Sequence, residues 1–155
     1  FGRGNWFKKS VNTGAKWAQL ELTVFGGPYD RRKVWDNIFV DGDKMGQSGI
    51  PVAKEIGLRT LRSIIESHNN LDPADMSEAA QSKRQISGID QLNGMEICAK
   101  VKVEKGTNGY ADQNKILIVL TPNSKDFISG GAAPITSQAP QPQATASGPV
   151  PDWAR

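Results

Sequence analysis

Aromatic rings and positive charges lie close together in two short stretches of the N-terminal third of the chain. The first stretch contains Trp6, Lys8, Lys9, Lys16 and Trp17, and the second contains Tyr29, Arg31, Arg32, Lys33 and Trp35. Cationic side chains can neutralise phosphates, and exposed rings offer flat faces on which unpaired bases stack, each contributing about 1 to 3 kcal/mol. This combination is typical of a surface that binds a single-stranded nucleic acid. The alternative is that some of the rings, Trp17 and Trp35 among them, belong to the core.

The sequence around each of these side chains indicates which are the best candidates for stacking on bases and which for contacting phosphates. Trp6 lies in a polar segment that contains glycine, and Trp17 points away from the apolar side of its strand, so both are the strongest stacking candidates. Arg31, Arg32 and Lys33 follow a Gly-Gly-Pro turn and are the strongest phosphate candidates. Lys100 and Lys102 share the polar face of a later strand and can extend the cationic surface, although an ordinary solvated face explains them equally well.

Residues that commonly carry catalysis are few. His68 is the only histidine and lies near a predicted helix end, and Cys98 is the only cysteine and has no basic partner close in sequence. Together they provide too few ligands for a zinc site. Asp36, Asp41 and Asp43 could bind Mg²⁺, yet acids beside a glycine are usually solvated turn residues. We therefore predict a protein that is not an enzyme and that needs no cofactor or metal.

Composition divides the chain of 155 residues into two parts. Residues 1–128 contain the periodic apolar segments and are predicted to form one domain, whereas residues 129–155 are rich in Pro, Gln, Ala and Ser and are predicted to be a disordered tail. Trp153 stands out in that tail as an anchor for docking a partner protein, with an inert linker as the alternative. The net charge of +3 suits a polyanionic partner.

Cysteine usage and hydropathy bear on location. A single cysteine cannot form an intramolecular disulfide, which favours a reducing compartment such as the cytoplasm. No apolar run approaches the ~20 residues that a membrane-spanning helix needs, so we expect no membrane association. The sequence leaves the oligomeric state open and is compatible with a homo-oligomer.

Hydrophobic periodicity predicts the order strand, strand, helix, short helix, strand, strand. Alternation predicts strands over residues 18–25, 34–40 and 95–104, and an apolar run predicts the last strand over residues 115–120. A long helix is expected to begin near Pro51. Its apolar face would contain Val52, Ile56, Leu61, Ile64, Ile65 and His68, and its other face Lys54, Glu55, Arg59, Arg62 and Glu66. The short helix is expected to begin with Asp72 as its N-cap and Pro73 in its first turn.

Two folds fit this order. One is an OB-like β-barrel of five strands with a helix between strands 3 and 4, provided that one strand precedes or overlaps Trp6. The other is a plain antiparallel α+β sheet. Periodicity alone favours neither.

Four segments carry recognisable motifs in a fixed order, over residues 8–17 (KKSVNTGAKW), 25–40 (FGGPYDRRKVWDNIFV), 86–106 (ISGIDQLNGMEICAKVKVEKG) and 109–122 (GYADQNKILIVLTP). Their order and spacing resemble a family of small bacteriophage proteins of nominally unknown function, related in architecture to phage single-stranded DNA-binding proteins. The resemblance implies the OB-like barrel, with its opening strand within residues 1–7. It also places Tyr110, in the loop of the last hairpin, at the position of the family's tyrosine, where it could clamp a strand.

The residues and the resemblance together predict a single-stranded DNA-binding protein that acts in phage DNA replication or recombination, in the cytoplasm of the host. Its partners would be single-stranded DNA and, through the C-terminal tail, replication or recombination proteins. The tail departs from the acidic tips usual in such proteins, because it has only Asp152 and ends in Arg155. The alternative function is a phage structural or protein-interaction role, in assembly or in inhibition of a host enzyme.

Overall fold

The computed structural model describes residues 7–107 and 109–129. In chain order the strands and helices are β1 (Phe7–Lys9), β2 (Lys16–Thr23), β3 (Lys33–Asp41), α1 (Val52–His68), α2 (Glu78–Arg84), β4 (Cys98–Glu104) and β5 (Gln113–Leu120). Two short 3-10 helices, η1 (Gly27–Tyr29) and η2 (Ile89–Leu92), lie in the connections. The predictions for Trp6, for Trp153 and for residues 130–155 of the tail fall outside the described residues.

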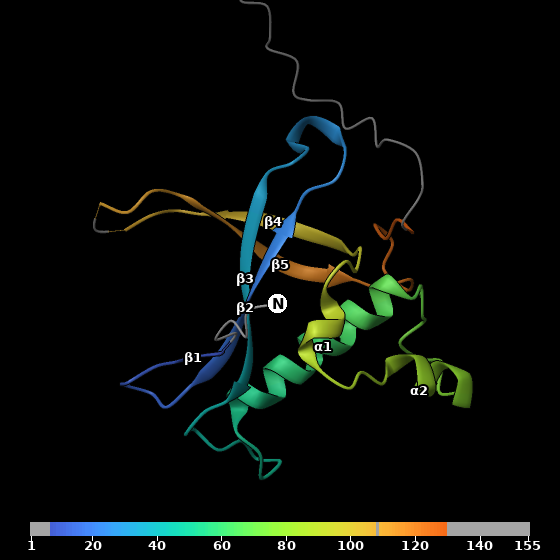
Figure 1. The fold of residues 1–155 in the computed structure, drawn as a ribbon, viewed down its shortest axis with the longest axis horizontal. Helices are drawn as coiled ribbons and strands as arrows, with labels where there is room; N and C mark the ends of the chain where they lie inside the picture. Colours follow the sequence, from blue (N-terminus) through green and yellow to red (C-terminus); the bar gives the residue numbers. More distant parts are fainter. Residues whose placement is uncertain (1–6, 108, 130–155) are drawn as a thin grey trace, which may run out of the picture.

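The strands form two antiparallel sheets, one of order β1-β2-β3 and a hairpin of β4 and β5 (Figure 1). The fold is therefore a mixed α+β arrangement, and no hydrogen-bonded ladder joins the two sheets within the described ranges. The predicted barrel of five strands is not closed by these residues. The physical reason lies at β1, which is only three residues long and pairs with β2 alone, so it cannot bridge the first sheet to the free edge of β4.

Helix α1 packs against β3 and β5, and the core forms where Ile38, Ile64 and Val119 meet. The predicted start of this helix is confirmed, with Pro51 at its N-cap. The predicted division of its faces is wrong at Ile56, which is 51% exposed, at His68, which is exposed as well, and at Glu66, which is 2% exposed. No helix in the described part of the chain has the length and apolar character needed to cross a membrane.

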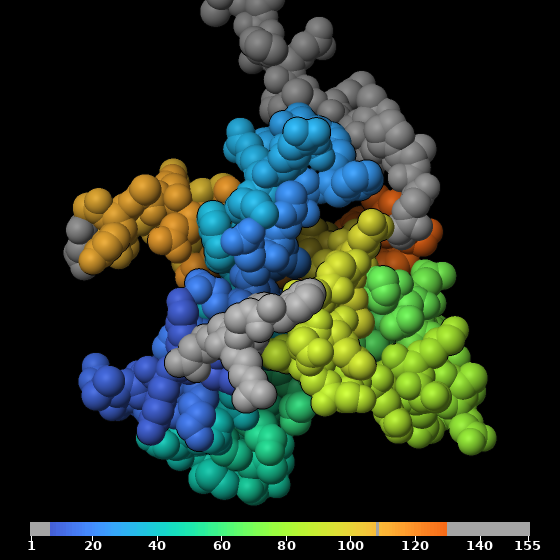
Figure 2. Space-filling model, in the orientation of Figure 1, coloured from blue at the N-terminus to red at the C-terminus, as the bar shows by residue number. Residues whose placement is uncertain are grey.

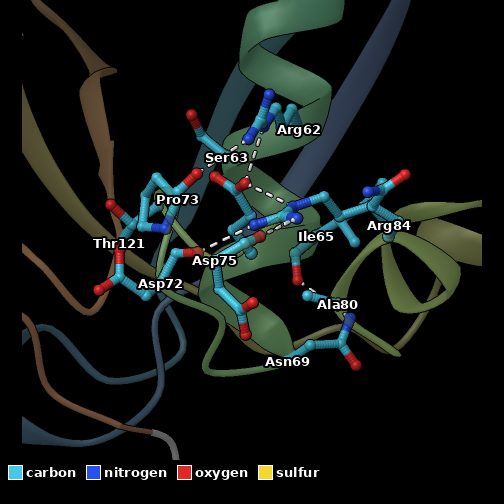
Figure 3. Close-up of polar contacts among 12 residues, drawn as sticks. Arg62, Ser63, Ile65, Asn69, Asp72, Pro73, Asp75, Ala80, Arg84 and Thr121 are labelled. Atoms are coloured by element: carbon cyan, nitrogen blue, oxygen red, sulfur yellow. Dashed lines mark hydrogen bonds and ion pairs between the residues drawn. The ribbon is translucent and has the colours of Figure 1, made fainter. Parts of the chain in front are cut away.

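Glu66 is buried because two arginines accompany it. Figure 3 shows these arginines, Arg62 and Arg84. Arg62 Nε and Arg84 Nε lie 2.7 and 2.8 Å from the same carboxylate atom, Glu66 Oε1. Other guanidinium N–H groups donate to backbone carbonyls between the helices, Arg62 Nη2 to Pro73 and Arg84 Nη1 and Nη2 to Asp75 and Asp72. We call Glu66, Arg62 and Arg84 the Glu66 network. It fastens α2 and the segment before it to α1.

The Glu66 network explains why the second helix begins later than predicted. Helix α2 is capped by Ser77, whose Oγ accepts a hydrogen bond from Ala80 N, and it does not begin at Asp72. The Asp72 side chain instead accepts from Ala74 N in a local turn. The Asp72 and Asp75 carbonyls are used by Arg84, so this stretch is held as an irregular connection.

The β4–β5 hairpin extends away from the helices (Figure 1). Alternation along β4 predicted a half-buried strand, but Val101 and Val103 are 46% and 61% exposed. On β5, Leu117 and Ile118 are likewise more than half exposed. Apolar alternation predicted the strand correctly, yet it could not show that the outer half of the hairpin projects beyond the core.

Candidate nucleic-acid interface

One side of the β2–β3 ladder carries aromatic and polar side chains, while the other side faces the core. Cross-strand pairs in this register project to the same side. Four pairs on the side away from the core define what we call the outer face: Trp17 with Phe39, Gln19 with Asn37, Glu21 with Trp35, and Thr23 with Lys33. The opposite side presents buried Ala18 and Ile38 to the core. Alternation in β2 thus places Trp17 as the sequence predicted.

The outer face has three aromatic rings. Trp17 and Phe39 pack together with ring centroids 6.2 Å apart, and both are half-buried. Trp35 is 51% exposed and is the most accessible of the three. It was omitted from the predicted binding residues, although burial of its neighbour Val34, at 3% exposure, places it on the outer side by strand alternation. That alternation was the signal that could have found it.

Lysines border this face, and each is held by a neighbouring polar group. Lys8, opposite Trp17 in the ladder, donates from Nζ to Gln19 Oε1 at 2.6 Å. Lys33 lies 2.5 Å from Glu21 and donates to Thr23 Oγ1 at 2.9 Å. Both cations are therefore already positioned along the outer face.

Lys9 and Lys16 pair with each other in the register at the far end of this sheet. Lys16 Nζ lies 2.8 Å from Asp41, and this hydrogen bond raises the pKa of Lys16 and lowers that of Asp41. The hydrogen bond from Lys33 likewise lowers the pKa of Glu21, with the Trp35 indole adding to the effect. These carboxylates are ionised at neutral pH, so a phosphate must compete with them for the lysines.

The predicted cationic corner lies at the tip of the β2–β3 hairpin, the lighter blue projection in the upper part of Figure 2. Arg32 lies 5.0 Å from the centroid of the Tyr29 ring, in cation–π contact. Arg31 is held at a positive φ of 63° and its side chain is 91% exposed, 3.6 Å from Asp30. Lys8 and Lys16 lie at the other end of β2. The seven residues of β2 that follow Lys16 span about 23 Å toward this corner, at ~3.3 Å per residue.

The other predicted binding residues lie on the β4–β5 hairpin. Lys100 lies 2.5 Å from Asp126, and Lys102 lies 4.0 Å from Glu104. Tyr110 is 75% exposed in the loop that joins the two strands. The structure thus divides the predicted set between the β1–β2–β3 sheet, with its turn, and a separate hairpin.

A groove connects these two parts. It has a volume of about 380 Å³ and is lined by Gln19, Lys33 and Trp35 of the outer face and by Asp112, Gln113 and Asn114 at the start of β5. Lys100 and Lys102 are not among its lining residues. Asp112 is fixed by Lys105 at 2.6 Å and by the backbone N–H of Gly106 at 3.0 Å. The groove places an exposed indole beside a lysine and several side-chain amides.

The residues weighed for catalysis have other surroundings. Across the residues that the structure describes, no group of three or more His, Cys, Asp or Glu side chains could hold a metal ion. Asp36 lies on the inner side opposite Leu20, where burial raises its pKa and the charge of Lys115 opposes that shift. His68 accepts a hydrogen bond from Glu96 N at 3.3 Å.

On the outer face, the Trp17–Phe39 pair and Trp35 lie on either side of the Gln19–Asn37 pair, with lysines along the face and a groove at one side. Chemically, such a surface can hold phosphates and stack planar rings. Comparisons with protein-family models, with curated proteins and with solved structures found no match for this chain.

Proposed function

We propose that the protein binds single-stranded DNA along the outer face of β2 and β3, in phage DNA replication or recombination. The observation that carries this proposal is the exposed Trp35 indole, which lies beside Lys33 in a groove and on the same face as Trp17. An unpaired base can stack on the indole and its own phosphate can meet Lys33, while phosphates farther along the strand can meet Lys8 at one end of β2 and Arg31 at the other. A duplex, whose bases are already stacked, cannot use the ring in this way.

The order of elements supports an OB-like arrangement as part of the proposal. Three strands, helices and two strands follow one another in the chain. OB-folds bind oligonucleotides on the face of strands 2 and 3 and with the loops between strands 1 and 2 and between strands 4 and 5. Here the outer face belongs to β2 and β3, and Tyr110 lies in the β4–β5 loop.

The proposal predicts that Trp35→Ala weakens binding of a fluorescent oligothymidine about five- to 150-fold, since one stacked base contributes ~1 to 3 kcal/mol. The salt dependence of affinity should change little, because stacking releases no counterions. Fluorescence anisotropy at two salt concentrations measures both quantities. Met76→Ala removes a large side chain that is 63% exposed beside α2 and serves as the matched control.

The same titration with a duplex of equal length tests the class of ligand. Tighter, salt-sensitive binding to the single strand is expected. Equal and weak binding to the single strand and to the duplex would contradict the proposal. A folded Trp35→Ala variant that binds oligothymidine as tightly as the unaltered chain would contradict it too.

A second prediction concerns Glu21, whose carboxylate holds Lys33 on the outer face. Glu21→Gln should release Lys33 for a phosphate and remove a negative charge, so we expect tighter binding and a salt slope steeper by up to about 0.7. Glu78→Gln removes an exposed acid from α2 and is the charge-matched control. If Glu21→Gln leaves the affinity and its salt dependence unchanged, Lys33 does not contact a phosphate of the bound strand.

A second candidate function is protein interaction, and the β4–β5 hairpin favours it. Val101, Val103, Leu117 and Ile118 are between 46% and 61% exposed on this projecting element. Exposed apolar side chains that cluster on one element commonly mark contact sites for proteins. Loss of a partner in a Val103→Lys variant, with oligothymidine binding unchanged, would separate this function from the first.

A further inference from the structure

We propose that the groove beside Trp35 holds a single base of the bound strand and selects a base that carries an exocyclic amino group, such as cytosine, over thymine, which has none. This inference rests on the proposed function and adds a base preference to it.

The lining of the groove is richer in hydrogen-bonding groups than phosphate binding requires. Gln19, Gln113 and Asn114 among its lining residues have amide side chains, each with both donors and an acceptor. Phosphate oxygens accept hydrogen bonds only, so the amide oxygens have no use against the backbone of DNA. The edge of a base offers donors and acceptors side by side and matches an amide.

The size of the groove fits one base. Its volume of about 380 Å³ is near the lower end of the ~300 to 1,000 Å³ typical of small-molecule sites. The Trp35 indole, half exposed, provides a flat wall against which the ring can stack. Lys33 beside it can meet the phosphate of the same nucleotide.

The groups that would read the base are held before it arrives. Gln19 Oε1 accepts from Lys8 Nζ at 2.6 Å, which orients this amide and leaves its N–H₂ free to donate. Gln113 and Asn114 stand in register with Glu104 and Val103 on β4, so their backbones are fixed. In the part of the chain that the structure describes, the side chains of Gln113 and Asn114 make no hydrogen bond to the protein.

Asp112 and the neighbouring amides of Gln113 and Asn114 together give the site its preference. The Asp112 carboxylate is an acceptor only, and Lys105 and Gly106 N hold it in place. The N4 amino group of cytosine donates to such an acceptor, whereas thymine has the carbonyl oxygen O4 at the same ring position, which a carboxylate repels. A carboxylate is unfavourable in a site that binds phosphates alone, because it repels them. Accepting a hydrogen bond from the base explains its presence here.

The test is an anisotropy titration of the full chain with oligodeoxycytidine and oligothymidine of equal length at one salt concentration. We expect the cytidine strand to bind about five- to tenfold more tightly, as one or two additional hydrogen bonds would give. Asn114→Ala and, separately, Gln113→Ala should reduce that ratio toward one and change oligothymidine affinity less than twofold. Gln47→Ala, an exposed amide in the loop before α1, should leave the ratio unchanged.

The outcomes separate this inference from the proposed function. Tight, salt-sensitive and equal binding of both strands would overturn the base preference and leave single-strand binding standing. A preference for cytidine that survives both substitutions in folded variants, checked by circular dichroism, would also overturn it. Failure to bind either strand would overturn both proposals.

Discussion

Replacing Glu66 by alanine is expected to lower the free energy of unfolding by about 3 to 5 kcal/mol, the usual cost of removing one partner from a buried ion pair. The Glu66 side chain is 3% exposed and the Arg84 side chain 11%. Both guanidinium groups use the same oxygen, Glu66 Oε1. Without it, the buried guanidinium of Arg84 would keep its hydrogen bonds to the carbonyls of Asp72 and Asp75 but lose its ion pair.

Urea denaturation followed by circular dichroism measures this loss. Glu96→Ala removes an exposed glutamate and should change the stability by less than about 0.5 kcal/mol. Glu66→Gln keeps the shape and one acceptor oxygen, so its loss should be smaller than that of Glu66→Ala. Equal stability of Glu66→Ala and the unaltered chain would mean that Arg84 does not depend on Glu66.

The Glu66 network is expected to contribute to stability and the outer face to binding. The Glu66→Ala variant can separate these two contributions. The network joins α1 to α2, whereas Trp35 and Lys33 lie on β3. A Glu66→Ala protein that is still folded at low temperature should therefore bind oligothymidine with nearly unchanged affinity. Stability and binding would then be lost through separate groups of residues.

The sequence was sufficient where a local pattern decides the structure. Alternation in β2 placed Ala18 inside and Trp17 outside, and Pro51 marked the start of α1. Both features depend on neighbours within a few positions. The same alternation identified β4, because strand periodicity survives whether or not the strand is covered.

Prediction failed where contacts between segments far apart in the sequence determine the local structure. Asp72 and Ser77 are both suitable N-caps, and the choice of Ser77 follows from Arg84 contacting the carbonyl of Asp72. Glu66 reads as a solvated residue unless Arg84, eighteen positions later, is known to meet it. The groove joins Trp35 to Gln113 and Asn114, nearly eighty positions apart, and no local pattern predicts that proximity.

Replacing Gly57 by alanine is expected to have the second large effect on stability, and to destabilise the protein although helix propensity alone would favour alanine. Gly57 is buried within α1, where a glycine is normally ~1 kcal/mol less favourable than alanine. A Cβ built on it would lie 1.6 Å from the carbonyl oxygen of Phe39 and 2.6 Å from its carbon. Because these are backbone atoms of β3, no side-chain rotation can relieve the overlap. The helix passes the strand at a distance that only glycine allows.

Gly57→Ala is therefore expected to destabilise the protein by about 3 kcal/mol, at the upper end for inserting a methyl group into a packed interior. Thr60→Ala, one turn later in the same helix, is the control and should be neutral or slightly stabilising. Urea denaturation compares the two variants. A Gly57→Ala protein that is more stable than the unaltered chain would show that α1 does not touch β3 at Phe39.

Gly57→Ala should also change the packing of the outer face, because Phe39 contacts both Gly57 and Trp17. Its carbonyl meets Gly57, and its ring packs on Trp17 with centroids 6.2 Å apart. Displacing β3 to admit a methyl group must move the Phe39 ring and expose Trp17. We expect a red shift of tryptophan emission in Gly57→Ala that disappears when Trp17 is replaced by Phe. Close packing of α1 on β3 would then be what holds Trp17 on the outer face.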